Sequence, residues 1–252
     1  MQRSSRHKTI IRALGTQPVS VDALVQLTGA SAITIRRDLA DLAGHGLLRR
    51  IHGGAVAVNL RGTPQPYALR AAEHADDKES IARLVASLIH DDMSIILDNG
   101  STTVAIAHAL VGKPLTALCL SLRSAVPLGE SEAATVITPG GQIKPGSLRT
   151  TASESIAALK DFRADVAIIG TCSATPSNGL TVTTHEDAKV KQAIIASSAH
   201  VILAATGDKL SRTSSFRFAD LDDINDLVTT ADAPESALDE FRTAGVIVHI
   251  AD

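Results

Sequence analysis

The segment at 98–103, with the sequence DNGSTT, combines residue types that bind phosphate groups and sugar hydroxyls. Asp98 ends an apolar run, Gly100 turns the chain, and Ser101, Thr102 and Thr103 could open a helix. Backbone N–H groups and hydroxyls at a helix start can bind phosphate, while a carboxylate accepts hydrogen bonds from sugar hydroxyls. No Gly-Lys-Ser/Thr follows at Walker A spacing. Turn and cap chemistry explains the same residues equally well, so both interpretations stay open.

Glycines and lysines further along the chain suit the same chemistry. Gly140, Gly141 and Gly170 each follow a predicted strand, where a glycine lets the backbone approach a ligand closely. Lys191 and Lys209 could each supply the cation that a phosphate needs. A plain turn explains the glycines equally well, and single lysines are usually solvated.

A second kind of chemistry is indicated by arginines between residues 31 and 43. This run predicts a helix whose apolar positions Ile35, Leu39 and Leu42 share one face. Arg37 then points away from that face, as expected for a helix that reads DNA bases in the major groove. The side chains that we expect at the DNA from this helix are Ser31, Ile33, Thr34, Arg36 and Arg37. Taken alone, the arginine pair fits a solvated surface helix better.

A basic hairpin is predicted directly after this helix. Residues 47–51 and 55–58 are expected to form two short strands around a turn at His52, with Arg49 and Arg50 beside it. Glycines at 44 and 46 are expected to end the preceding helix. We expect Arg49, Arg50 and His52 to contact DNA as a wing.

The elements upstream favour the DNA interpretation over the surface helix. Residues 3–14 and 21–27 predict two more helices, the second capped by Ser20 and ended by Gly29. Only a tight turn separates that second helix from Ser31, which is the spacing of a helix-turn-helix. Three helices and a wing make a complete winged-helix module.

Charge is divided unevenly along the chain. Residues 1–60 contain eight Lys and Arg against three Asp and Glu, whereas the whole chain has 24 against 27. A basic start on an acidic body is expected when only the start touches phosphates of nucleic acid. Aromatic residues make up 2% of the chain, which argues against single-strand binding by base stacking.

The remainder of the chain alternates predicted strands with predicted helices. The strands are expected at 94–98, 115–120, 134–138, 165–169, 201–205, 226–229 and 246–250. The helices are expected at 78–89, 102–110, 122–128, 153–159, 186–197 and 234–243. The strand runs are apolar throughout, as in parallel strands covered on both faces. We therefore expect an α/β fold class, with a three-layer domain around a mostly parallel sheet.

Length and composition set the domain organisation. We expect a DNA-binding domain at 1–58, a linker at 59–76 that contains Pro64 and Pro66, and an α/β domain at 77–252. The N-terminus is polar and no apolar run approaches the ~20 residues of a membrane helix, so we expect a cytoplasmic protein with no membrane partner. Cys119 and Cys172 are too few for a disulfide framework. Nothing has metal-ligand spacing, and we expect neither metal nor cofactor.

The basic module resembles the N-terminal domain of the DeoR family of bacterial transcriptional regulators. The runs that carry the resemblance are TIRRDL at 34–39, GLLRR at 46–50 and HGGA at 52–55. The resemblance implies a repressor of carbohydrate-metabolism genes that binds a double-stranded operator as a homo-oligomer, a dimer or a tetramer. It also implies a C-terminal domain that senses a phosphorylated sugar or a related metabolite.

The resemblance extends to the α/β domain. It implies that this domain is similar in fold to ribose-phosphate isomerases. DNGSTT at 98–103 resembles the family's effector loop, and the glycines at 140–141, Lys191 and Lys209 fall at family positions. Two places depart from the family pattern. Its Thr-Asn is here Cys119-Leu120, and its Leu-Ala-Asp ends here in Ala205. These changes affect which effector class we expect.

The alternative function is a sugar-phosphate isomerase-like enzyme with an accessory DNA-binding module. An isomerase needs a base beside the sugar carbonyl, and the dense titratable run is His185-Glu186-Asp187. Acidic residues at the start of a helix also simply complement its dipole. We therefore expect a regulator and not an enzyme, and the sequence does not name the effector, the operator or the regulated genes.

Overall fold

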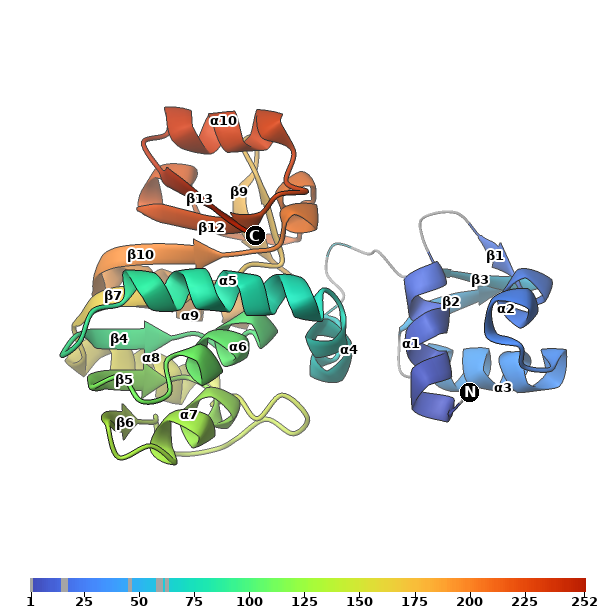
Figure 1. Cartoon of the computed structure of the whole chain (residues 1–252), viewed down its shortest axis with the longest axis horizontal. Helices are drawn as coiled ribbons and strands as arrows, with labels where there is room; N and C mark the ends of the chain where they lie inside the picture. The colour runs from blue at the N-terminus through green and yellow to red at the C-terminus, as the bar shows by residue number, and fades with distance from the viewer. Residues whose placement is uncertain (1, 15–17, 45–46, 58–60, 62–63) are drawn as a thin grey trace. The chain divides into compact units, whose positions relative to one another are not determined.

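The computed structural model describes the chain except for residues 1, 15–17, 45–46, 58–60 and 62–63 (Figure 1). It divides into two compact units, Met1–Glu73 and His74–Asp252, each described here by itself. Gly46, which we expected at a helix end, lies outside the described residues, as do 58–60 and 62–63 of the expected wing and linker.

The first unit holds helices and a small antiparallel sheet in the order expected of a winged helix. Its helices are α1 (Arg3–Ala13), α2 (Val21–Thr28), α3 (Ala32–Gly44) and the short α4 (Tyr67–Ala72). Its strands are β1 (Val19–Ser20), β2 (Leu48–Ile51) and β3 (Gly54–Ala57), in the order β1-β3-β2. The three predicted helices and the hairpin are confirmed, whereas the two-residue strand β1 was not predicted.

Local sequence signals explain where these helices begin and end. The Ser20 hydroxyl accepts a hydrogen bond from the Ala23 N–H and so caps α2. Gly29 ends α2 in the left-handed conformation, with φ of 67°, which costs glycine little. The Ser31 hydroxyl accepts from the Thr34 N–H at 3.3 Å at the start of α3. The turn between α2 and α3 is therefore fixed by a glycine stop and a serine cap.

The second unit is built on a parallel sheet that has seven strands within the described residues, in the order β13-β12-β10-β7-β4-β5-β6. Its strands are β4 (Ser94–Leu97), β5 (Leu115–Cys119), β6 (Ala134–Ile137), β7 (Ala164–Ile169), β10 (Ser198–Ala204), β12 (Asp226–Thr230) and β13 (Ile247–Ala251). Its α-helices are α5 (Ala75–Leu88), α6 (Ser101–Ala109), α7 (Leu122–Gly129), α8 (Ala152–Asp161), α9 (His185–Ala196) and α10 (Glu235–Thr243). All seven predicted strands and six predicted helices are present, and no end is shifted by more than three residues.

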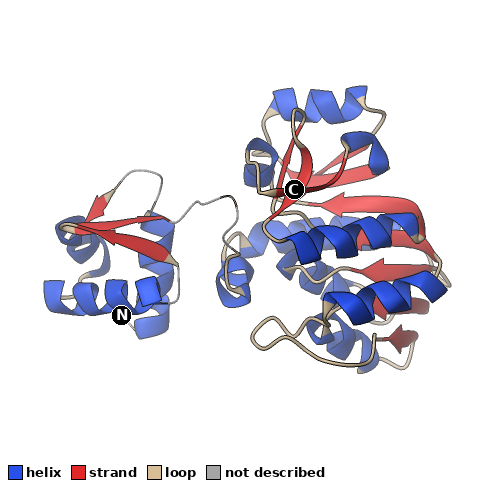
Figure 2. Cartoon of the chain, turned by 180° about the vertical axis from the view of Figure 1, so that it is seen from behind, coloured by secondary structure: helices blue, strands red, loops and turns tan. Residues whose placement is uncertain are grey.

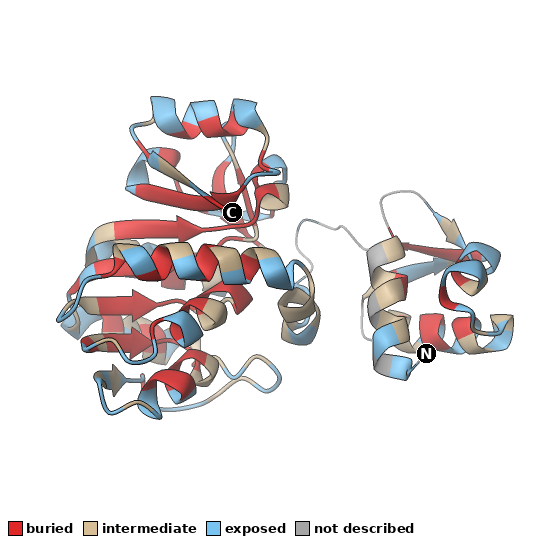
Figure 3. Ribbon diagram, viewed as in Figure 1, coloured by how far each residue is buried: buried red, intermediate tan, exposed pale blue. Residues whose placement is uncertain are grey.

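Helices cover both faces of this sheet, as Figures 1 and 2 show from opposite sides. Alternating residues of β4 pack into two different hydrophobic cores on opposite faces of the sheet. Ile96 packs with α8, α9 and α10, whereas Ile95 and Leu97 pack with α5 and α6. Because both faces are covered, the inner strands β12, β10, β7, β4 and β5 are mostly buried, whereas the edge strands β6 and β13 are partly exposed (Figure 3). The expected three-layer α/β architecture is confirmed.

A second, three-stranded antiparallel sheet was not predicted. It consists of β8 (Ser173–Thr175), β9 (Gly179–Val182) and β11 (Phe216–Ala219), in the order β11-β9-β8. Two short 3-10 helices, η1 (Gly207–Ser211) and η2 (Leu221–Asp223), flank β11. No helix in the described parts of the chain is long and apolar enough to cross a membrane.

Candidate functional sites

The outer face of α3 exposes the side chains that we expected at DNA. Ile33 is 78% exposed, and Arg36 and Arg37 are exposed beside it. Ser31 and Thr34 have a further role, because their hydroxyls hydrogen-bond each other at 2.9 Å within the helix cap. The arginines are therefore presented to solvent by a helix whose first turn is already fixed.

The inner face of α3 is held by an ion pair as well as by apolar packing. Ile35, Leu39 and Leu42 are buried as predicted. Asp38 lies among them at 3% exposure, and its carboxylate accepts from Arg6 Nε at 2.5 Å and contacts His7 Nε2 at 3.0 Å. Both partners are on α1. The ion pair therefore ties the candidate recognition helix to α1.

The role of Asp38 was missed by the sequence analysis. Burial alone would raise the pKa of Asp38, but the hydrogen bonds from Arg6 and His7 outweigh it and hold that pKa below its ordinary value of 3.8. The available signal was a carboxylate on the apolar face of a helix, three residues after Ile35. A buried carboxylate needs a cationic partner, and α1 supplies it.

The wing is anchored to α2 by its turn. The Gly53 carbonyl accepts from the Val21 N–H at 2.8 Å, and a Cβ added at Gly54 would lie 2.2 Å from the Val19 carbonyl oxygen. The side chains expected at DNA from this hairpin, Arg49, Arg50 and His52, are all exposed. Glycine at 54 is required because β1 pairs with β3 at this position, and any side chain there would collide with the backbone of β1.

In the second unit, Asp98 and Lys191 form a buried ion pair where β4 and β7 end. Asp98 is 1% exposed and Lys191 is 3% exposed. The Lys191 ammonium donates to Asp98 Oδ2 and, at 2.7 Å, to the Gly170 carbonyl. The Gly170 N–H donates to Asp98 Oδ2 at 3.1 Å. Three residues predicted separately from the sequence are thus in direct contact: Asp98 directly after β4, Gly170 directly after β7, and Lys191 on α9.

The place of this cluster is the topological switch point of the sheet. The chain runs from β4 outward through β5 and β6, then returns to the other side of β4 as β7. In open α/β sheets, ligands bind beyond the carboxyl ends of the strands at such a point. Asp98 and Gly170 follow the two strands that flank it.

The electrostatics of the pair leave one acceptor available. Burial alone would lower the pKa of Lys191, but the charges of Asp98 and Asp187 and the hydrogen bond to Asp98 hold that pKa above its ordinary value. Lys191 is therefore a cation at neutral pH. Asp98 Oδ1 is buried and has no hydrogen-bond partner among the described residues. A buried carboxylate oxygen without a donor is costly, and a ligand hydroxyl could satisfy it.

One of the hydroxyl residues after Asp98 stabilises the loop itself, and the other two lie at the helix start. The Thr103 hydroxyl accepts from the Gly100 N–H and lies 2.8 Å from the Asp98 carbonyl. Ser101 and Thr102 are buried in the first turn of α6. Both interpretations of this segment thus have support, because Thr103 closes the turn and the helix start still lies next to the ion pair.

Other predicted effector residues lie further from this cluster. Gly140 and Gly141 follow β6, and Lys209 lies in η1 after β10, each two strands away from β4 in the sheet. Gly141 has φ of 96°, and a Cβ there would lie 2.6 Å from Glu154 Cγ. That glycine is required by close packing against α8.

The residues that depart from the family pattern are buried in the hydrophobic core. Cys119, Leu120 and Ala205 are all buried, with no more than 1% exposure. Burial raises the pKa of the Cys119 thiol to about 12, so it stays protonated. The second cysteine, Cys172, is half-buried and free.

Four charged residues near the ion pair were not identified as ligand-binding from the sequence. Lys144 and Arg149 precede α8, and they pair with Glu186 and Asp187 in the first turn of α9. Asn99 Nδ2 also donates to Asp187, at 3.3 Å. The acidic residues were predicted to complement the helix dipole or, in the isomerase alternative, to supply a base. Their pairing with Lys144 and Arg149 was not predicted, because the path of the 138–151 segment cannot be read from its residues.

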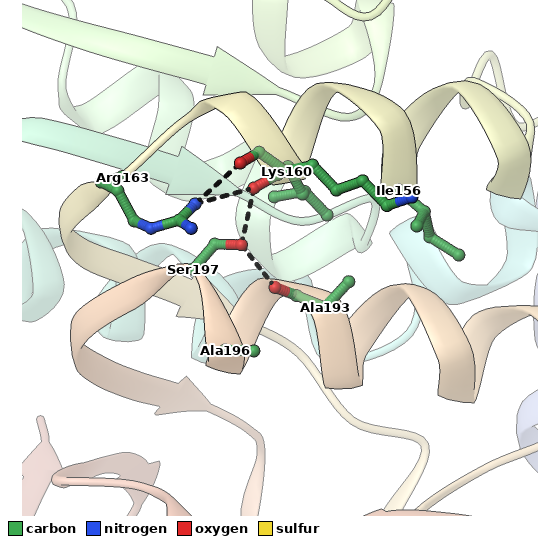
Figure 4. Close-up of a pocket in the computed structure, with 7 residues that line it drawn as sticks. Ile156, Lys160, Arg163, Ala193, Ala196 and Ser197 are labelled. Carbon is green, nitrogen blue, oxygen red and sulfur yellow. Dashed lines mark hydrogen bonds between the residues drawn. The ribbon is translucent and has the colours of Figure 1, made fainter.

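Two further features carry no functional argument. A shallow hollow of about 260 Å³ lies between α8 and α9 and is lined by Ile156, Leu159, Lys160, Arg163, Ala193, Ala196 and Ser197 (Figure 4). It is at the amino ends of β7 and β10, opposite the ion pair, and the guanidinium of Arg163 donates to carbonyls that end α8. Asp220, Asp222 and Asp223 come together near η2, but all three are exposed, and exposed acidic groups commonly cluster without a metal.

Comparison with protein families gives two matches. A DeoR-like helix-turn-helix domain matches residues 6–61, and the DeoR C terminal sensor domain matches residues 73–231. The matched segments fall in the first and second compact units respectively, apart from residue 73.

Individual proteins match over most of their length. The chain is 32% identical to a glycerol-3-phosphate regulon repressor from Haemophilus influenzae, over 96% of this chain and 94% of that protein. It is 31% identical to the HTH-type transcriptional repressor GlcR from Bacillus subtilis, over 84% and 81%. A solved ribose 5-phosphate isomerase A from Methanocaldococcus jannaschii aligns with 55% of this chain and 55% of its own, at 15% identity and a TM-score of 0.41. That structural likeness is too loose to carry an argument about activity.

Proposed function

Because the chain belongs to the DeoR family of transcriptional regulators, we propose that it is a repressor released from its operator by a phosphorylated metabolite. The observation that carries the proposal is the buried Asp98–Lys191 pair with its unpartnered Oδ1, at the switch point of a sheet in the unit that matches a sensor domain. A cation, a free carboxylate oxygen and a helix start suit a ligand with both a phosphate and hydroxyls.

The first unit supports the DNA half of this proposal. In the proposed complex α3 enters the major groove with Arg36 and Arg37 toward base edges, and Arg49 and Arg50 on the wing hold phosphates. Residues 1–58 act as the DNA-binding domain, and residues 77–252 sense the effector and associate with further copies. Two or four copies would read repeated half-sites, as symmetric regulators do.

The names of the relatives suggest the effector class. One relative is named for glycerol 3-phosphate, a small phosphate monoester with free hydroxyls. We propose an effector of that class, a phosphorylated sugar or polyol, and repression of carbohydrate-metabolism genes. The isomerase alternative is not favoured, because both matching families and the matched relatives are transcriptional regulators.

Release requires that the effector bind the DNA-free state more tightly than the DNA-bound state. A coupling free energy of about 1–3 kcal/mol between the two sites would lower operator affinity by about 5–150-fold. This magnitude is sufficient for a genetic switch and is measurable by standard binding assays.

The test compares release of DNA in the wild type and in a variant without the buried charges. Removing Asp98 alone would leave Lys191 as a buried unpaired charge, at a cost of about 3–5 kcal/mol of stability. The double variant Asp98→Asn with Lys191→Gln removes both charges and avoids this cost. An operator fragment is selected from random DNA by the full chain, and its binding is measured by fluorescence anisotropy with glycerol 3-phosphate, ribose 5-phosphate and their unphosphorylated forms.

We expect a phosphate ester to release the wild type, and the unphosphorylated compound to leave it bound. The double variant should bind the operator as the wild type does and fail to respond. A double variant that folds and is still released would place the effector elsewhere.

A further inference from the structure

Lys144, Arg149, Glu186 and Asp187 form a cluster of opposite charges, which we call the ionic clasp. Arg149 Nη1 lies 3.3 Å from Asp187 Oδ1, and Arg149 Nη2 lies 3.7 Å from Glu186 Oε2. The Lys144 ammonium donates to the same Glu186 oxygen. The clasp therefore joins the segment before α8 to the first turn of α9.

The ionic clasp borders the Asp98–Lys191 pair. Asn99, the residue after Asp98, donates to Asp187 Oδ1 at 3.3 Å, and Arg149 donates to that same oxygen. Asp187 also raises the pKa of Lys191 through its charge. The backbone of Arg149 also forms an isolated antiparallel β-bridge with Ser121, which lies two residues after the end of β5 and caps α7. The clasp thus lies at the carboxyl ends of the neighbouring strands β4 and β5.

The carboxylates of the clasp compete with any incoming anion for the clasp's cations. Its two cations face two carboxylates, and Lys191 faces Asp98, so each of these three cations already has a carboxylate partner. Lys191 is buried, whereas the side chains of Arg149 and Lys144 are 20% and 35% exposed. An incoming phosphate can therefore reach the clasp cations, where it competes with Glu186 and Asp187 for their hydrogen bonds.

We propose that Arg149 and Lys144 are phosphate ligands of the effector site, and that Glu186 and Asp187 hold them until a phosphate monoester takes their place. This inference rests on the proposed function and specifies which part of the effector each group recognises: the clasp takes the phosphate, and Asp98 takes a hydroxyl. Arg149 suits this role because its guanidinium can donate two hydrogen bonds to one phosphate.

The proposal predicts opposite effects from the two sides of the same ion pairs. Removing a cation removes a ligand of the phosphate, so Arg149→Gln and Lys144→Gln should each weaken binding, by about tenfold or more for the loss of a charge-assisted hydrogen bond. Removing the competing carboxylate in Glu186→Gln should instead tighten binding. A merely structural clasp would give effects of the same sign, because either change breaks the same contact.

Isothermal titration of the full chain tests this with inorganic phosphate, glycerol 3-phosphate, ribose 5-phosphate and, as the uncharged match, glycerol. The control variants are Arg242→Gln and Glu235→Gln, which break an exposed ion pair on α10 and should leave binding unchanged. The result expected is weaker phosphate-ester binding in both cation variants and tighter binding in Glu186→Gln.

Two outcomes overturn the inference in different ways. In the first, the wild type binds a phosphate ester, and this affinity is unchanged in Arg149→Gln and Lys144→Gln or reduced in Glu186→Gln. That result rejects the clasp as the phosphate site while the proposed function stands. A wild type that binds none of the phosphate compounds rejects the proposed effector class, and the clasp's role with it.

Discussion

At the scale of single residues, buried carboxylates organise both units. Asp38 is held by Arg6 and His7 of α1, and Asp98 is held by Lys191 and a backbone N–H. In each case a charge that burial would disfavour is kept by a specific partner, so loss of one member leaves the other uncompensated. The two carboxylates differ in one respect. Both oxygens of Asp38 have partners, whereas Asp98 Oδ1 has none among the described residues.

The Asp38 pair predicts a pH-dependent contribution to the stability of the first unit. The pKa of Asp38 is lowered on folding, so the pair stabilises the fold above the ordinary value of 3.8 and this contribution is lost as the pH falls through the lowered pKa. Asp38→Asn should therefore cost about 1–3 kcal/mol at pH 7. The cost should shrink as the pH falls below about 4.

Hydrogen exchange of the α1 and α3 amides at pH 7 measures this cost in the intact chain. The matched control is Asp41→Asn on the same helix, because Asp41 pairs with Arg3 at an exposed position and should contribute less than about 1 kcal/mol. Equal effects of the two substitutions would show that the buried position of Asp38 does not matter.

Arg37 is the residue most directly aimed at bases in the proposed complex. Its side chain is exposed on α3 opposite the buried Ile35 and Leu39. Arg37→Ala should weaken binding to the selected operator by about 1–3 kcal/mol and should change binding to random DNA much less. Arg83→Ala, an exposed arginine on α5, is the control. Unchanged operator affinity in Arg37→Ala would remove this residue from base recognition.

At the scale of elements, segments with apolar periodicity and the hairpin marked by its glycine turn were predictable, whereas the strands β1, β8, β9 and β11 were not. The helices and the seven strands of the parallel sheet could be predicted from the spacing of their apolar residues, because that spacing determines which of their side chains are buried. Strands β1, β8, β9 and β11 have two to four residues each and exist because a neighbour pairs with them. Pairing of this kind depends on tertiary context, which the pattern of two or three residues does not encode.

The same reasoning applies to the candidate effector site. Asp98, Gly170 and Lys191 could be predicted because the ends of neighbouring parallel strands converge at one edge of a sheet. Arg149 could not be, since its position depends on the route of the segment after β6. The resemblance to a family identified the wing arginines as well, but only the structure shows that Gly54 must be glycine for β1 to pair there.

The wing predicts a change in the salt dependence of DNA binding. Arg49 and Arg50 are exposed on β2 beside the turn, and contacts with phosphates release counterions. Replacing both with glutamine should reduce the slope of log affinity against log salt by about one to two units, on specific and random DNA alike. Anisotropy titrations over a range of salt concentrations give the slope. A slope equal to that of the wild type would mean that the wing does not touch phosphates.

At the scale of the whole molecule, the chain joins two units with different charge and different chemistry. The basic start contains the proposed DNA contacts, and the acidic remainder contains the proposed effector site. Both units belong to one chain of a family of regulators, so binding at one site is expected to change affinity at the other. The central claim is this coupling, and thermodynamic linkage makes it reciprocal.

The most direct test measures the coupling from both directions on the full chain. Operator affinity is determined with and without a saturating phosphate ester that binds, and the affinity for that ester is determined with and without saturating operator. We expect each ligand to weaken binding of the other by the same factor, between about 5-fold and 150-fold. A phosphate ester that binds the protein and leaves operator affinity unchanged would contradict this expectation.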